Sequence, residues 1–269
     1  MPSRIKHVAI VSENYALLGK FYEALFGMKA SANARPDSAV AISDGYIGMN
    51  VNPRSPGRQA GFDHFGIEVD DVEAIAKRVR EKYPTVQLLK RPSNRPFAGI
   101  SMHDPAGNVF DLSQEGMANR ADVYVDVARS AQPHLRRIRH FMLRTVEPER
   151  IAHFYHEVFE LQLQDKAIDD PNYYLTDGEV TLIVAPWRIS DYEGSGIERP
   201  ALDHLGFEVE SLERFQADLR RITARNPYLA PKAFTGGEGD ARVRLLATCR
   251  YGQYQLCDPD GVLIDVCER

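Results

Sequence analysis

Two stretches of eight residues, "FDHFGIEV" at 62–69 and "LDHLGFEV" at 202–209, both carry a histidine at the third position. Imidazole nitrogens are common ligands of divalent metals, so the repeated histidine suggests two metal sites. Because successive side chains of a strand point to opposite faces, His64 would share a face with Gly66 and Glu68. Apolar residues would occupy the other face, and the second stretch has the same pattern around His204. Each stretch is therefore predicted to form one wall of a cavity.

A carboxylate near the end of the chain strengthens this hypothesis. Asp265 lies within "GVLIDVCE", an otherwise apolar strand pattern. Burying an unpaired carboxylate is costly even after relaxation, so we expect a cation beside it. A divalent metal held by two neutral imidazoles and one carboxylate would supply that charge and leave positions open for water, substrate or dioxygen. For any single histidine, a hydrogen-bonded strand residue is the simpler alternative, but the repetition favours ligands.

The chain repeats itself beyond the two octets. "IKHVAI" followed by "FYEALFG" is answered by "IRHFML" followed by "FYHEVFE", and "HDPAGNVFDLSQE" is answered by "CDPDGVLIDVCER". The blocks occur in the same order in both halves, with the octet between them. Gene duplication explains this order better than coincidence, and it means that each half should fold in the same way.

Each half is expected to contain the same elements twice over. A strand rich in β-branched residues precedes a helix with one apolar face, as in "NYALLGKFYEALFG". Further strands follow around the turns "DG" and "DPAG". The chain is thus predicted to be an α+β protein of four βαβββ units, paired into two half-open barrel domains. We expect these domains at residues 1–117 and 138–269. Residues 118–137 would form the linker, with a short strand at "DVYVDV".

Several other stretches are predicted to be loops or structural residues. The "GGEG" at 236–239 precedes no helical pattern, and "RISDYEGSGIERP" after Trp187 is expected to be a loop that could cover a site. Cys249, Cys257 and Cys267 form neither a CxxC motif nor a disulfide framework, and we expect them to be reduced and structural.

Composition favours small-molecule chemistry over other functions. Of the 269 residues, 43% are hydrophobic and 26% are charged, with a formal net charge of −5 from interspersed acidic and basic side chains. This balance argues against nucleic acid or an anionic membrane as the main partner. The chain has no apolar run near the roughly 18 residues of a membrane-spanning helix and no recognisable targeting signal, so we expect a cytoplasmic location.

The order of a histidine in the first strand, an "FYxxxFG"-type helix, a "DHxGxEV" strand and an acid after "DPxG" resembles the vicinal oxygen chelate superfamily. This superfamily includes glyoxalase I, bleomycin-resistance proteins and type I extradiol dioxygenases. The resemblance implies paired βαβββ units that curl around a metal. The ligands that it implies are His140, His204 and Asp265 in the C-terminal half, and His7, His64 and Asp111 in the N-terminal half.

Two such domains in one chain most resemble the type I extradiol dioxygenases, whose iron normally lies in the C-terminal domain. The resemblance therefore implies a metal-dependent, dioxygenase-like oxidoreductase that acts on a small oxygenated, perhaps catecholic, substrate. Fe(II) is the first choice of metal, and Mn(II) or another divalent ion is the second. We expect the C-terminal triad to be loaded first, and whether both triads hold metal stays open. An edge strand in each domain leaves room for a homo-oligomer.

The sequence also departs from that family. Both acids are aspartates where the family usually has glutamate. Ring-cleaving members carry a tyrosine and a histidine at the positions held here by Gln255 and Leu246. Glyoxalases take a fourth ligand from a strand that offers only Asn50 here. Two alternatives therefore stand beside the dioxygenase: a metal-dependent lyase, isomerase or epimerase of the glyoxalase type, and a non-catalytic, ligand-sequestering protein of the bleomycin-resistance type.

Overall fold

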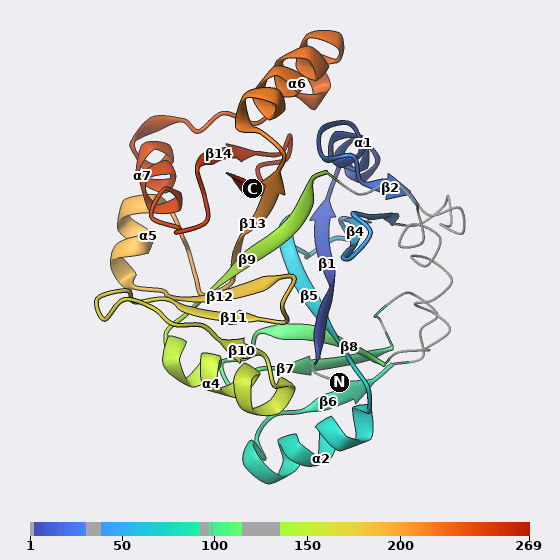
Figure 1. Ribbon diagram of the computed structural model, residues 1–269, viewed down its shortest axis with the longest axis vertical. Helices are drawn as coiled ribbons and strands as arrows, with labels where there is room; N and C mark the ends of the chain where they lie inside the picture. The colour runs from blue at the N-terminus through green and yellow to red at the C-terminus, as the bar shows by residue number, and fades with distance from the viewer. Residues whose placement is uncertain (1–2, 31–38, 92–96, 98, 115–134) are drawn as a thin grey trace.

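The computed structural model describes residues 3–30, 39–91, 97, 99–114 and 135–269, and these form two mixed β-sheets with helices packed around them (Figure 1). The first sheet has the order β2-β3-β4-β1-β5-β8-β7-β6. Its strands are β1 (Arg4–Ser12), β2 (Lys29–Ala30), β3 (Val40–Ser43), β4 (Gly48–Pro53), β5 (Gly61–Val69), β6 (Leu88–Lys90), β7 (Ile100–His103) and β8 (Val109–Gln114).

The second sheet repeats this arrangement with the order β10-β11-β12-β9-β13-β15-β14. Its strands are β9 (Arg137–Thr145), β10 (Gln162–Leu163), β11 (Tyr173–Thr176), β12 (Thr181–Pro186), β13 (Leu202–Val209), β14 (Tyr254–Cys257) and β15 (Leu263–Glu268). The helices are α1 (Tyr15–Phe26), α2 (Val72–Lys82), α4 (Pro148–Phe159), α5 (Ile189–Ser195), α6 (Leu212–Arg225) and α7 (Gly236–Leu246), and a 3₁₀ turn, η1, spans Pro227–Leu229.

The centre of each sheet is built from corresponding strands. β1 pairs antiparallel with β5, and β9 with β13, so the strands that open consecutive βαβ units lie side by side. The strand that carries Asp111 or Asp265 runs parallel to the second strand of each pair, so that β8 lies beside β5 and β15 beside β13. This confirms the predicted α+β fold of paired βαβββ units.

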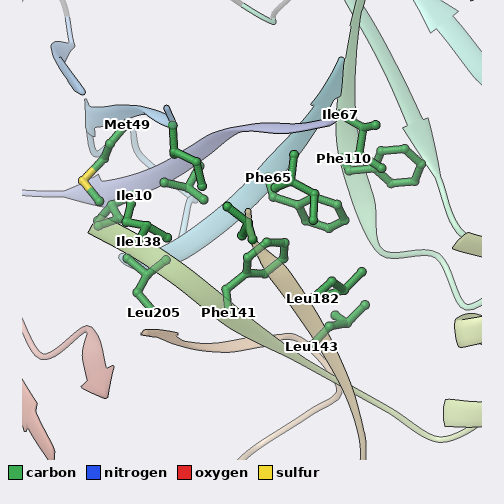
Figure 2. Packing of buried hydrophobic residues seen from close by; sticks show 14 of the residues in the cluster. Ile10, Met49, Phe65, Ile67, Phe110, Ile138, Phe141, Leu143, Leu182 and Leu205 are labelled. Carbon is green, nitrogen blue, oxygen red and sulfur yellow. The ribbon is translucent and has the colours of Figure 1, made fainter. Parts of the chain in front are cut away.

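The hydrophobic core is shared between the two halves. Apolar residues from β1, β5, β9 and β13 belong to one buried cluster with the inward faces of the helices. Phe65 of β5 packs against Phe141 of β9 with ring centroids 4.9 Å apart, and Phe110 and Leu205 lie in the same cluster (Figure 2). The faces that carry Phe65 and Phe141 therefore meet in this core, which leaves the opposite faces for the histidines, as strand alternation predicts.

Helices from opposite halves also pack together. In Figure 1, α1 lies beside α6, and α2 lies beside α4. α1 begins after Asn14 and ends at Gly27, whose φ of 68° closes the helix in the left-handed conformation that glycine adopts without strain. The apolar face predicted for this helix is confirmed.

Two buried tyrosines tie the halves together at equivalent places. The Tyr22 hydroxyl on α1 donates to Asp258 in the "DPDG" turn of the other half, at 3.0 Å. The Tyr155 hydroxyl on α4 donates to Asp104 in the "DPAG" turn, at 3.3 Å. Both tyrosines are fully buried. Burial raises the pKa of Asp258 to about 6, although backbone amides and Tyr22 oppose this rise.

The fourth unit differs from the prediction. After β13 and α6, the chain forms α7 over Gly236–Leu246, where "GGEG" was predicted to be a loop, and only β14 and β15 follow in the second sheet. The "RISDYEGSGIERP" stretch likewise contains the short helix α5, which packs against α7 (Figure 1). Glycine is tolerated at the start of a helix because the amides of the first turn have no intrahelical partners. The glycine content of residues 236–239 was therefore a poor basis for predicting a loop.

Most of the predicted linker at 118–137, including "DVYVDV", lies outside the described residues. No helix in the described ranges is both long enough and apolar enough to cross a membrane.

Candidate metal centre

The structure brings all six predicted ligand residues together, in two clusters on equivalent strands. His7 on β1, His64 on β5 and Asp111 on β8 form the first cluster, which we call the N-terminal triad. The second, the C-terminal triad, consists of His140 on β9, His204 on β13 and Asp265 on β15. Within each cluster the possible ligand atoms lie within 4.8 Å of one another. Both clusters therefore have a size that a metal ion could bridge.

Strand register explains why the C-terminal side chains converge. Gly206 on β13 pairs with His140 on one side and with Asp265 on the other, so the histidine and the acid flank a residue without a side chain. A Cβ atom at Gly206 would lie 1.9 Å from Cε1 of His140. The imidazole thus occupies the space above this glycine, and the glycine in "DHxGxEV" is required for the site. Gly66 has the same position between His7 and Asp111.

The C-terminal triad is completely buried. His204 and Asp265 are 0% exposed and His140 is 1% exposed. Oδ2 of Asp265 lies 3.6 Å from Nε2 of His204 and 3.7 Å from Nε2 of His140. These distances are too long for hydrogen bonds. In the described part of the chain, neither Asp265 Oδ2 nor His204 Nε2 has a hydrogen-bond partner. Two atoms with lone pairs or protons therefore face each other in a buried site without being satisfied.

Neighbouring side chains fix the direction of these atoms. Asp203 lies 2.9 Å from Nδ1 of His204 and accepts its hydrogen, which leaves the Nε2 lone pair directed at Asp265. Nε2 of Gln255 donates to Oδ1 of Asp265 at 3.1 Å, which leaves Oδ2 for the histidines. Hydrogen bonds of this kind set the tautomer and orientation of residues that bind metals.

Two arginines keep Asp203 ionised. Arg242 lies 2.6 Å and Arg144 lies 3.2 Å from Oδ1 of Asp203. Burial by itself raises the pKa of Asp203, but the charges of Arg144 and Arg242 and the bond to His204 outweigh it and hold the pKa well below its usual range. Burial lowers the pKa of His140, so this imidazole is neutral at pH 7 and able to act as a ligand.

A turn after α7 covers the C-terminal triad. Sγ of Cys249 lies 3.7 Å from Nε2 of His140, and the ring of Tyr251 lies 5.2 Å from the His140 ring between centroids. Gly252 lies so close to Asp265 that a Cβ atom there would be 2.0 Å from Oδ1. Cys249 is a free thiol with 5% exposure, and it belongs to the same cluster of potential ligands as the triad. The free state of the cysteines is as predicted, but the purely structural role expected for Cys249 does not fit this position.

The N-terminal triad has the same register but different neighbours. Asp111 receives an ion pair from Arg91 at 3.1 Å, a hydrogen bond from Ser101, and a contact from Nε2 of His64 at 3.3 Å. The ring of Phe97 stacks on the His7 ring, with centroids 4.9 Å apart and an angle of 8° between planes. This triad thus has a cationic side chain beside its acid and an aromatic ring over one histidine.

The N-terminal hydrogen bonds also change the protonation of His64. Burial lowers the pKa of His64, but its bonds to Asp111 and Asp63 outweigh this and raise the pKa to about 9. His64 is therefore an imidazolium at neutral pH in the structure as it stands. Arg58 is bonded to Asp63, which in turn contacts Nδ1 of His64. An arginine and an aspartate thus orient the second histidine in this half too.

Sequence reasoning missed the aspartates that precede the histidines in both octets. Strict alternation sets Asp63 and Asp203 on the face opposite to the histidines. The register of β5 skips from Phe62 to His64 and that of β13 from Leu202 to Leu205, so each aspartate lies in a β-bulge that lets it reach the neighbouring ring. The signal that could have found them is the "DH" dipeptide in both octets.

The glutamates predicted to share the histidine face lie further along the strands. Glu68 is paired with Arg4 at 3.1 Å, and Glu208 is paired with Arg139 and Arg269. His103 is held by the backbone, because its Nε2 accepts from the amide of Gln87 at 3.0 Å. These residues therefore stabilise the sheet and do not enter either cluster.

The residues of the C-terminal triad fit a divalent metal. Buried polar atoms are nearly always satisfied, and an imidazole nitrogen and a carboxylate oxygen that face each other without partners are what a metal ion would satisfy. Imidazole, carboxylate and thiol groups together suit several transition metals. The structure thus contains a buried His/His/Asp/Cys cluster that could hold a metal ion.

Solved structures with the same fold include metal enzymes. The chain is similar to the Mn(II)-bound glyoxalase from Novosphingobium aromaticivorans, at 13% identity and a TM-score of 0.67 over 99% of this chain and 83% of that one. It is also similar to 2,2',3-trihydroxybiphenyl 1,2-dioxygenase from Sphingomonas wittichii, at 13% identity and a TM-score of 0.65 over 100% and 91%. An extradiol ring-cleaving dioxygenase from B. fuscum matches at 16% identity and a TM-score of 0.64 over 98% and 70%. At these identities the likeness establishes the fold alone.

A search of curated proteins gives no significant match. The family model described as the glyoxalase, bleomycin resistance protein and dioxygenase superfamily matches residues 4–112 and 137–266, which is most of the chain. Together with the paired units and the position of the triads, this match shows that the chain belongs to the glyoxalase/bleomycin resistance protein/dioxygenase superfamily.

Proposed function

We propose that this protein is a metal-dependent enzyme whose centre is the C-terminal triad of His140, His204 and Asp265. The observation that carries the proposal is the buried pair of unsatisfied atoms, Nε2 of His204 and Oδ2 of Asp265, 3.6 Å apart. A buried carboxylate without a cation destabilises a fold, so a cation is expected beside Asp265. Within the described residues, the ion-pair partners of Asp265 are the two histidines alone.

The chain's own residues would hold and tune this centre. His140, His204 and Asp265 would bind the ion, Asp203 would orient His204, and Gln255 would orient Asp265. When bound, the metal would supply a Lewis-acidic position at which two adjacent oxygen atoms of a substrate can be chelated. Because the triad is buried, a substrate reaches it only when the turn at residues 249–252 or α7 moves.

The first reaction that we propose is extradiol-type oxygenation of a small oxygenated molecule such as a catechol, with Fe(II) or Mn(II) as the metal. Two imidazoles and one carboxylate form the ligand set of non-haem iron oxygenases. The Sphingomonas wittichii protein is named as a dioxygenase and the B. fuscum protein as an extradiol ring-cleaving dioxygenase. We also propose that the chain has two domains, residues 1–117 and 138–269.

A second candidate is a lyase, isomerase or epimerase that uses the metal as a Lewis acid. Gln255, at the position where ring-cleaving members carry a tyrosine, donates to Asp265, and Leu246, at the position of their histidine, is buried among apolar residues. Tyr254 points into the hydrophobic core beside Phe215. These positions therefore lack the tyrosine and histidine of ring-cleaving members, which favours a reaction that does not need those two residues.

Metal analysis and oxygen uptake test the proposal together. We expect purified protein to bind one divalent ion per chain and His204→Ala to lose it. Metal-loaded protein should then be assayed for oxygen uptake with a panel of catechols and for conversion of hydroxy- and keto-compounds without oxygen. Oxygen uptake supports the dioxygenase, and oxygen-independent turnover supports the second candidate. Stoichiometric ligand binding without turnover would contradict the proposal of an enzyme and point to a sequestering protein. So would ligand binding by protein that contains no metal in any preparation.

A further inference from the structure

The C-terminal triad has a fourth neighbour whose chemistry the proposed function does not use. Cys249 is 5% exposed, forms no disulfide, and has its Sγ atom 3.7 Å from Nε2 of His140. The potential ligand atoms of Cys249, His140, His204 and Asp265 all lie within 4.8 Å of one another. A thiol in such a position can be a packing residue or a ligand, so Cys249 by itself does not decide the matter.

The unsatisfied atoms of the triad supply an independent observation. His204 and Asp265 are 0% exposed, and their Nε2 and Oδ2 atoms have no hydrogen-bond partner among the described residues. Oδ2 of Asp265 also lies 3.7 Å from Nε2 of His140, the nitrogen that Sγ of Cys249 contacts. The four groups therefore surround one point, and two of them lack partners until something occupies it.

Three of the six separations among these atoms match a four-coordinate ion. Zinc bonds to nitrogen, oxygen and sulfur are about 2.0–2.3 Å long, so a tetrahedral site separates its ligand atoms by about 3.3–3.7 Å. The separations here are 3.6 Å for His204 to Asp265, 3.7 Å for His140 to Asp265, and 3.7 Å for Cys249 to His140. All three lie at the upper end of that range, before any adjustment of side chains to a bound ion.

The turn that carries Cys249 is held in place by the backbone. The Cys249 amide donates to the carbonyl of Leu246 at 2.9 Å, and the Gly252 amide donates to the carbonyl of Cys249 at 3.2 Å. Gly252 lets this turn approach Asp265, because any side chain there would collide with the carboxylate. The sulfur thus reaches the centre from a compact turn between α7 and β14, and its position needs no rearrangement of the sheet.

We propose that Cys249 is a fourth protein ligand of this centre. The resting site is then a closed His₂-Asp-Cys set, suited to Fe(II) or another divalent ion that accepts thiolate, with Co(II) as the spectroscopic probe. On binding, the thiol loses its proton to solvent as the sulfur–metal bond forms. The inference rests on the proposed function, and it deepens it: a chelating substrate binds by displacing Cys249 or by raising the coordination number.

The N-terminal triad lacks this feature and provides the internal comparison. Ser101 pairs with Asp111 in the register that Gln255 has with Asp265, and Phe97 stacks on His7 where Cys249 and Tyr251 meet His140. The cluster there contains three potential ligand residues and no cysteine. The proposal therefore predicts a sulfur-bound metal in one half of the chain.

Titration of metal-free protein with Co(II), followed by absorption spectroscopy, tests the proposal. For wild type we expect a thiolate-to-cobalt charge-transfer band in the near ultraviolet and the intense visible bands of a tetrahedral ion. Cys249→Ser should lose the charge-transfer band and bind Co(II) at least tenfold more weakly. Cys257→Ser, which removes a buried free thiol on β14, is the matched control and should keep the wild-type spectrum.

The outcomes separate the two proposals. Wild type that binds one Co(II) without a charge-transfer band, or Cys249→Ser with an unchanged spectrum, would overturn the role of Cys249 and leave the triad as a metal centre. Wild type that binds no Co(II) would overturn both. The wild-type spectrum needs no variant, so the test holds even if Cys249→Ser does not fold. Proton release adds a second readout, because wild type should release one more proton per Co(II) than Cys249→Ser does.

Discussion

The two triads have the same residue types on equivalent strands, and they differ in what surrounds the acid. Asp111 has Arg91 at 3.1 Å, Ser101, and His64 at 3.3 Å. Oδ2 of Asp265 has no hydrogen-bond partner in the described residues and is paired only with two histidines at 3.6 Å and 3.7 Å. The protein itself therefore supplies a positive charge beside the N-terminal acid, whereas beside Oδ2 of Asp265 we propose that a metal supplies it.

On our proposal, ligand types and register alone do not make a metal centre. In both halves a glycine between the histidine and the acid makes the cluster possible. Burial lowers the pKa of His64, but its bonds to Asp111 and Asp63 outweigh this and raise the pKa to about 9. A metal ion would have to displace this proton before His64 could bind it.

The largest contrast is expected from the two glycines. An added Cβ at Gly206 would lie 1.9 Å from His140, so Gly206→Ala should displace the ring and abolish metal binding. At Gly66 the added atom would be 2.7 Å from Phe97 and 2.9 Å from Cβ of His7. Gly66→Ala should cost about 1–3 kcal/mol of unfolding free energy through overpacking and leave the metal content unchanged.

Equilibrium dialysis with Zn(II) and urea denaturation would measure both glycine variants. Equal loss of metal from the two variants would break the comparison between the triads, because it would mean that the N-terminal cluster also contributes a site.

The aspartates that orient the second histidine should give a smaller effect. Asp203→Asn replaces the charged carboxylate that fixes Nδ1 of His204 by a neutral amide, and loss of such a charged neighbour weakens metal affinity about 10- to 100-fold. Asp63→Asn makes the same change beside His64 and should leave the affinity of the chain unchanged. Competition with a chelator of known affinity measures both, and a weaker affinity in Asp63→Asn would show that the N-terminal triad is loaded.

Removal of the N-terminal cation should sharpen the comparison further. Arg91→Met leaves Asp111 with Ser101 and His64 and frees the position that the guanidinium occupies. We expect a second, weak site to appear, with affinity raised at least about tenfold over wild type, which corresponds to about 1.4 kcal/mol. Arg58→Met, which removes an arginine bound to Asp63 and not to the triad acid, is the matched control. A titration of Arg91→Met that shows one site would contradict the role given to Arg91.

The last contrast concerns the bonds between the halves, where we expect an effect on stability and none on metal binding. Tyr22→Phe removes the bond to Asp258 at 3.0 Å, and Tyr155→Phe removes the bond to Asp104 at 3.3 Å. Each change should lower the free energy of unfolding by about 1–3 kcal/mol, because a buried acceptor loses a donor. Tyr22→Phe should cost more because its bond is shorter, and neither variant should alter metal content. Urea denaturation resolves this order, and a larger loss in Tyr155→Phe would contradict it.

Much of the fold could be predicted from the sequence because its signals are local. Alternation along the octets, the apolar spacing of α1 and the turns of the hairpins all depend on neighbouring residues. Because the sequence repeats, each of these patterns could be checked in the other half. The histidines of the octets and Asp265 stood out by alternation, the full set of six was implied by the resemblance to the vicinal oxygen chelate superfamily, and the structure brings all six into two clusters. That they bind metal stays a prediction.

The remaining features depend on tertiary contacts. Asp203 reaches His204 only because a β-bulge overrides strict alternation, and Cys249 reaches His140 only because α7 and the following turn fold back over the sheet. Arg91 and Phe97, which distinguish the N-terminal triad, come from a segment outside the repeated motifs. No pattern of spacing shows which charges and rings will surround a cluster.

The central claim is that the C-terminal triad holds the metal and the N-terminal triad does not. Metal content of wild type, His204→Ala and His64→Ala, measured by elemental analysis on protein purified in parallel, tests it most directly. The account predicts one divalent ion per chain in wild type, none in His204→Ala, and one in His64→Ala. Two ions per chain in wild type, or an ion that is retained in His204→Ala and lost in His64→Ala, would contradict it.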